Sequence, residues 1–184
     1  MFNYSEANLE SLNDDLDKTL EECKELVENI KLSTNVNLSD FNELESTVYD
    51  VSGRIAFLGD VHPHEKIRDF GNEADSKIQN FALEIFNDDD LYKKYKEIDI
   101  SNADKESIEF HKDLGIDFKN AGHGLSDESR KRLIDIDKKL IELGISYSEN
   151  IAKDKTELKF SEAELNGLSK NELNNLKKDE EKFI

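Results

Sequence analysis

The chain has 184 residues, and its 43 acidic and 25 basic side chains give a formal net charge of −18. This charge argues against nucleic acids and anionic membranes as partners, because both are bound through basic surfaces. No segment approaches the roughly 20 apolar residues that span a bilayer, and the single cysteine, Cys23, cannot form an intramolecular disulfide. We therefore expect a cytoplasmic protein without a signal peptide.

The first helix is expected from about Ser5 to Lys31, with Ser5 as its N-cap, because the hydroxyl can accept a hydrogen bond from a free amide of the first turn. Its apolar residues fall on one narrow stripe. Four of them recur every seven residues, a spacing that is also typical of a coiled-coil seam, although Thr19 interrupts it. These four are Leu9, Leu16, Cys23 and Ile30.

Further helices are expected at about 40–58, from Pro63 to residue 87, through 91–95 and at about 103–121. Gly59 is the expected stop of the first of these, and Pro63 suits the first turn of the next, where its missing amide costs nothing. The acidic run Asp88-Asp89-Asp90 lacks the spacing and the final glutamate of a calcium loop, so it is interpreted as a solvated turn.

A helix from Asp127 to Ala152, capped by Ser126, is expected after the turn Gly122-His123-Gly124. It carries two apolar stripes, which predicts burial on two sides, either within this chain or against a part outside it. On this view Leu140→Ala would cost about 2–5 kcal/mol. The first stripe is Leu133, Ile136, Leu140, Leu143, Tyr147 and Ile151, and the second is Ile134, Ile141 and Ile145.

The tail differs from the rest of the chain. A short strand is expected near Thr156–Phe160, and two capping boxes, Ser161 with Glu164 and Ser169 with Glu172, are each expected to open a short helix. The predicted fold is therefore all-α, a bundle of long antiparallel helices with a strand-like tail segment near 156–160. We expect a helical domain at 1–152, and short helices with the start of a connection at 153–184.

One short run partly matches a zinc-binding motif. Zinc peptidases use H-E-x-x-H on a helix to place two imidazoles one turn apart. In His62-Pro63-His64-Glu65 the second histidine of that pattern is replaced by Arg68, a cation that would repel the metal. His62 cannot substitute, because Pro63 places it at a helix entrance. We therefore expect a polar helix start at this point.

The other candidates for chemistry are also expected to be structural. Cys23 lies in an apolar stripe, whereas a nucleophilic thiolate needs a base and a lowered pKa. His111 is expected to be a hydrogen-bonded core residue, and His123 a turn residue between two glycines. We thus predict no catalytic, cofactor-binding or metal-binding residue in this chain.

Several short motifs succeed one another through much of the chain. They are Phe57-Leu58-Gly59-Asp60-Val61-His62-Pro63, Ile67-Arg68-Asp69, Asp90-Leu91-Tyr92, Phe118-Lys119-Asn120-Ala121-Gly122, Ser148-Glu149-Asn150 and Phe160-Ser161-Glu162-Ala163-Glu164-Leu165-Asn166-Gly167-Leu168. In order and spacing they resemble the N-terminal region of the thimet oligopeptidase, neurolysin and oligopeptidase A family of zinc metallopeptidases. Tyr147 and Gly124 depart from the pattern of that family.

The resemblance implies helices that flank a deep channel admitting short peptides, with the zinc-binding H-E-x-x-H expected beyond Ile184. We therefore interpret the chain as the N-terminal helical part of a zinc metalloendopeptidase, inactive alone, that contributes channel wall and substrate gating. Its partners would be short peptides and the missing catalytic domain. No cofactor is expected in this chain, whereas zinc is expected in the full-length parent.

A second interpretation remains open at this stage. The heptad spacing from Leu9 to Ile30 also suits a stand-alone acidic helical protein-interaction module, with the seam of the first helix as its binding face.

Overall fold

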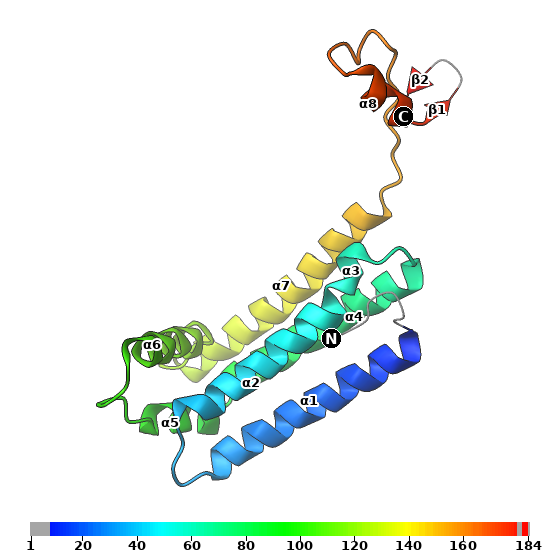
Figure 1. The fold of residues 1–184 in the computed structure, drawn as a ribbon. Coiled ribbons are helices and arrows are strands. Elements are labelled where there is room, and N and C mark those ends of the chain that lie inside the picture. Colours follow the sequence, from blue (N-terminus) through cyan, green and yellow to red (C-terminus); the bar gives the residue numbers. More distant parts are fainter. Residues whose placement is uncertain (1–7, 180–181, 184) are drawn as a thin grey trace. The chain divides into compact units, whose positions relative to one another are not determined.

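The structure, a computed structural model, describes residues 8–179 and 182–183 and confirms an all-α bundle (Figure 1). The chain divides into two units, Met1–Glu149 and Asn150–Ile184. None of the helices in the described part of the chain is both long and apolar enough to cross a membrane. The helical elements up to the unit boundary are α1 (Leu9–Leu32), α2 (Leu38–Val51), a π-helical turn (Ser52–Ala56), α3 (Leu58–Val61), α4 (Glu65–Phe86), α5 (Asp89–Glu97), α6 (Lys105–Asn120) and α7 (Asp127–Lys153), the last of which crosses it.

Side-chain caps determine where several helices begin. The expected cap Ser5 lies outside the described residues; α1 begins at Leu9, where the side chain of Asn8 accepts a hydrogen bond from the Ser11 amide. Asp88 caps α5 by accepting from the amides of Asp90 and Leu91, both at 2.8 Å. The acidic run therefore starts a helix rather than forming a solvated turn, because carboxylates are favoured at the positive end of the helix dipole.

Gly59 does not stop a helix, contrary to the expectation. α2 already ends at Val51, and Gly59 lies buried inside α3, against α4. A Cβ atom placed on Gly71 of α4 would lie 2.3 Å from the Gly59 nitrogen, so these two glycines let the helices approach at backbone distance. Pro63 lies just before α4 and not in its first turn, because the helix starts at Glu65 with His64 as its N-cap.

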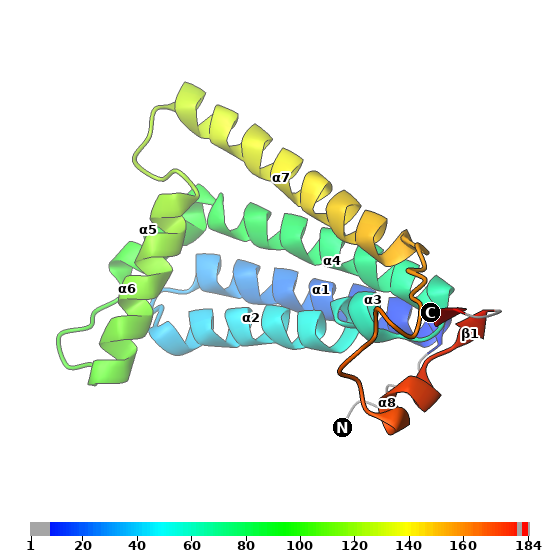
Figure 2. The ribbon, with the colours of Figure 1, turned by 90° about the horizontal axis from the view of Figure 1, so that it is seen from above.

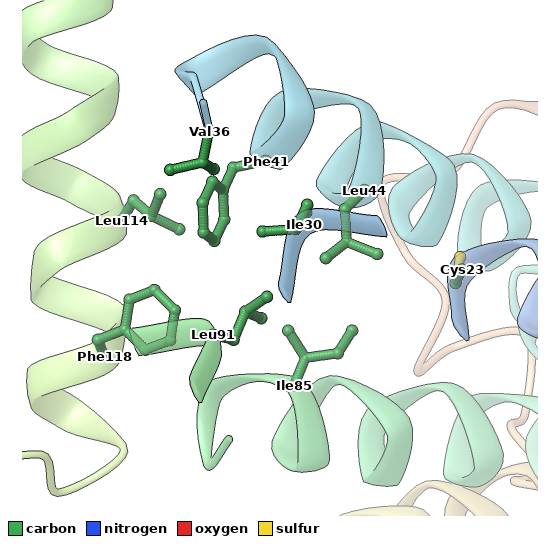
Figure 3. Close-up of a cluster of buried hydrophobic side chains, with 9 residues drawn as sticks. All are labelled: Cys23, Ile30, Val36, Phe41, Leu44, Ile85, Leu91, Leu114 and Phe118. Atoms are coloured by element: carbon green, nitrogen blue, oxygen red, sulfur yellow. The ribbon is translucent and has the colours of Figure 1, made fainter. Parts of the chain in front are cut away.

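Two apolar clusters form the core of the first unit. Figure 2 shows α1, α2 and α4 side by side with α6 across one end, and Figure 3 shows one cluster converging from five helices and the loop before α2. That cluster consists of Cys23, Ile30, Val36, Phe41, Leu44, Ile85, Leu91, Leu114 and Phe118. The other consists of Leu12, Leu16, Val51, Ile55, Leu58, Ile67, Ala74 and Ile78.

Most of the heptad seam of α1 is buried against other helices of the same chain. Leu16, Cys23 and Ile30 are buried in the two clusters. Thr19 is buried as well, and its hydroxyl donates to the Asp15 carbonyl at 2.8 Å, which satisfies the polar group within the helix. Since the chain's own helices cover most of this seam, it is not the free binding face that an interaction module would need.

The second unit is small. It contains α8 (Lys170–Asn175) and two strands, β1 (Lys178–Asp179) and β2 (Lys182–Phe183), which pair antiparallel. Of the expected strand at 156–160, only Phe160 takes part, in an isolated bridge to Phe183.

The two expected capping boxes of this unit behave differently. Ser169 and Glu172 form a complete box at the start of α8. At Ser161 the Glu164 carboxylate accepts from the Ser161 amide at 2.8 Å, but the segment that follows is a turn and not a helix. Gly167, six residues after Ser161, adopts a φ of 111°, a backbone conformation outside the right-handed helical region.

Candidate functional site

The zinc-like run lies at the junction of α3 and α4, where its groups are bound to one another. The His62 ring accepts through Nδ1 from the His64 amide at 3.1 Å. Arg68 donates to the carbonyl oxygens of His62 at 2.7 Å and Pro63 at 3.0 Å. The guanidinium therefore closes the turn, and a divalent cation would meet a fixed positive charge there. The side chains of this run therefore do not fit a zinc ion. The described residues contain no group of three His, Cys, Asp or Glu side chains that could hold a metal ion.

Cys23 is fully buried in the core cluster, as expected. Burial, and then the nearby Glu22 carboxylate, raises the pKa of the thiol to about 11, so it stays protonated and unreactive. His111 is half-buried rather than a hydrogen-bonded core residue. Its ring stacks on Tyr95 with centroids 4.6 Å apart and has no hydrogen bond to a described residue. Burial lowers the pKa of this imidazole.

His123 is a turn residue, as predicted, but its side chain does more than the sequence indicates. The ring is buried against Tyr92, and Nε2 lies 2.8 Å from the carbonyl oxygen of Phe86, to which it donates. Burial, and then the nearby Arg130 guanidinium, lowers the pKa of His123, which favours the neutral ring. Arg130 pairs in turn with Asp89. These contacts attach the start of α7 to the α4–α5 corner.

Beyond this attachment, α7 is packed on one side only. None of its described residues is buried, so the expected two-sided burial within this chain is wrong. The inner stripe (Ile134, Ile141 and Ile145) is half-buried, whereas Leu140 is 60% and Tyr147 is 69% exposed. We call the exposed set, Ile136, Leu140, Leu143 and Tyr147, the outer stripe.

A groove separates the inner stripe from the rest of the first unit. It has a volume of about 610 Å³ and runs between α7 and the segment that includes the π-helical turn, α3 and α4. Phe57 and Asn72 line one wall, and Ile141, Gly144 and Ile145 line the other, whose edge includes Leu140 of the outer stripe. Even the inner stripe is therefore incompletely covered, which leaves α7 as the most weakly packed long helix of the unit.

Leu140→Ala is therefore expected to change the free energy of unfolding by no more than about 0.5 kcal/mol, far less than a buried position would require. Ile141→Ala, which removes a half-buried side chain, should cost about 1 kcal/mol. Urea unfolding midpoints of the two variants measure the difference. If Leu140→Ala were the more costly of the two, the outer stripe would be covered in solution.

A search against models of protein families finds no match. Thimet-like oligopeptidase of Dictyostelium discoideum is 30% identical over 183 residues, which cover 94% of this chain and 27% of that protein. A probable thimet oligopeptidase of Arabidopsis thaliana is 30% identical over 83% of this chain and 22% of its own length. Mitochondrial intermediate peptidase of Phaeosphaeria nodorum is 23% identical over 83% of the chain and 21% of its own length.

The chain is a homologue of thimet-like oligopeptidases. This finding confirms the resemblance inferred from the ordered motifs. The chain spans about a quarter of the length of these thimet-like relatives, so most of each relative has no counterpart among the residues described above. The region of similarity contains the α3–α4 junction, whose side chains act in packing and turn formation.

Proposed function

We propose that this chain is the N-terminal helical part of a cytoplasmic zinc metalloendopeptidase that cleaves short peptides. In this role it would form part of the channel wall and gate substrate entry, and zinc would be held by residues outside this chain. Similarity to about a quarter of several peptidases supports the assignment.

The observation that carries the proposal is the outer stripe of α7. Contiguous exposed apolar side chains on one helix face are typical of an interaction surface. Leu140, Leu143 and Tyr147 are each more than half exposed. We propose that this stripe packs against the catalytic part of the parent, and that α7 thereby connects the bundle to the wall of the channel.

A chimera tests this proposal directly. In it, this chain replaces the matching quarter of the Dictyostelium thimet-like oligopeptidase, and hydrolysis of a quenched fluorescent nonapeptide is measured beside hydrolysis of casein. We expect cleavage of the nonapeptide and not of casein, whose chain is much longer than a short peptide. L140D/Y147D should lower kcat/KM at least about tenfold, because charge is introduced into a contact that excludes water.

The matched control is S146D/N150D, which adds the same two charges at exposed polar positions of the same helix. It should retain the activity of the chimera. A well-folded but inactive chimera, or equal activity of the two double variants, would contradict the proposal.

The isolated chain is expected to hydrolyse no peptide and to retain no stoichiometric zinc after dialysis. The physical reason is that Arg68 occupies the position of a second ligand and that Cys23 is buried and protonated. Metal analysis and a quenched-peptide assay check both statements. One tightly held zinc per chain would show that the donors rearrange around the metal.

A further inference from the structure

A cavity lies between α2, α4 and α6, on the core cluster of Figure 3. Its volume is about 290 Å³, at the lower end of the range for ligand pockets. That space suits one large side chain rather than a whole cofactor. Most of the lining is apolar, and the side chains that matter for the argument are Phe41, Leu44, Val48, Ile78, Ala82 and Phe118.

Three carboxylates stand around this apolar space, one on each helix: Glu45 on α2, Asp75 on α4 and Asp117 on α6. Within residues 8–179 and 182–183, none of the three forms a salt bridge. Asp75 accepts one hydrogen bond, from the Gln79 amide at 2.7 Å. Negative charge is thus concentrated at an apolar cavity, and no cationic side chain of the described residues forms a salt bridge with it.

The pKa values of all three carboxyl groups are raised. Partial burial raises the pKa of Glu45, and repulsion from Asp117 raises it further. Burial is also the main cause of the raised pKa values of Asp75 and Asp117. α2 adds to the imbalance because Leu38–Val51 contains no basic residue. A cation placed at the mouth would relieve this repulsion in a partly desolvated setting, where charges interact more strongly than in bulk water.

We propose that this cavity binds a short peptide by taking one large apolar side chain between α2, α4 and α6 while a neighbouring basic residue pairs with the carboxylates of Glu45 and Asp117. The apolar side chain would displace water from the cavity, and the basic residue would set the preferred charge of the ligand. The choice of a peptide as ligand rests on the proposed function. Binding itself can be measured on this chain alone, so it succeeds or fails independently of the chimera.

The chain contains no tryptophan, which gives a direct probe. Acetyl-Lys-Trp-Lys-amide is titrated with the full chain, and the emission of its single indole is followed. We expect a saturable blue shift, and binding at least about tenfold tighter than that of acetyl-Glu-Trp-Glu-amide. Acetyl-Lys-Gly-Lys-amide carries the same charge without the apolar side chain and should not displace the probe.

Variants separate the cavity from the general negative charge of the protein. E45Q and D117N should each weaken binding about threefold or more, whereas E43Q, which removes a charge from the same helix outside the cavity, should leave it unchanged. E45Q should also raise the Tm, because it removes a repulsive contact; lower affinity therefore cannot be attributed to unfolding. A82F should fill the cavity and abolish the blue shift.

Equal effects of E45Q and E43Q would overturn the proposal and indicate unspecific attraction of cations. Equal binding of the Lys and Glu peptides would overturn it as well. If A82F proves unfolded by circular dichroism, the comparison of E45Q, D117N and E43Q still decides the matter.

Discussion

Phe118→Ala is expected to destabilise the first unit by about 3–5 kcal/mol, which is a large share of the stability of a typical domain. Phe118 is fully buried, and its ring meets aromatic side chains from three other helices. The ring centroids lie 5.4 Å from Phe86, 5.4 Å from Tyr92 and 6.3 Å from Phe41. Truncation would therefore leave a void where α2, α4, α5 and α6 converge.

Thermal unfolding followed by circular dichroism measures this effect. For a chain of this length the loss corresponds to a Tm lower by about 6–20 °C. Phe118→Leu keeps much of the volume and should lower the Tm by clearly less. If the two variants had equal Tm values, the volume filled by the side chain at position 118 would be unimportant, and the expected void would not explain the loss of stability.

The long helices could be predicted from the sequence because each carries an apolar stripe at helical spacing. The prediction for 127–152 agrees with α7 within one residue at its end, and Ser126 does cap it, with its hydroxyl accepting from the Ser129 amide. Periodicity alone could not predict which other element packs against each stripe. Both stripes of α7 look alike in the sequence, but in the structure the inner stripe is half-buried, whereas Leu140, Leu143 and Tyr147 are more than half exposed.

Position-specific effects account for the remaining differences. The two glycines Gly59 and Gly122 have different roles. Gly59 permits a close approach of two helices, whereas Gly122 takes a φ of 95° in a turn. Only the tertiary structure distinguishes these roles.

The sequence also could not predict which polar side chains lie close together in the fold. His123 and Arg130 are brought to Phe86 and Asp89, residues far away in the sequence, and Glu45, Asp75 and Asp117 come from three separate helices. No local motif marks such an arrangement. The absence of an internal H-E-x-x-H was readable from the sequence, since that motif depends on residues one turn apart.

Gly71→Ala is the second change with a large expected effect, about 2–3 kcal/mol or more of destabilisation from overpacking. The new methyl group would lie 2.3 Å from the nitrogen and 2.8 Å from the Cα of Gly59. Both are backbone atoms, so relief requires α3 to move away from α4. The adjoining cluster, which contains Leu58 and Ala74, would have to open with it.

Gly144→Ala provides the matched control, because it is the same substitution in the interior of another long helix. A Cβ atom there meets nothing within 4 Å. Alanine has the higher helix propensity, so this variant should be more stable than the parent by about 0.5–1 kcal/mol. Urea unfolding of both variants should therefore give midpoint shifts of opposite sign. A stabilising Gly71→Ala would mean that the backbones of α3 and α4 do not approach as the structure places them, whereas a destabilising Gly144→Ala would mean that the groove beside α7 is closed in solution.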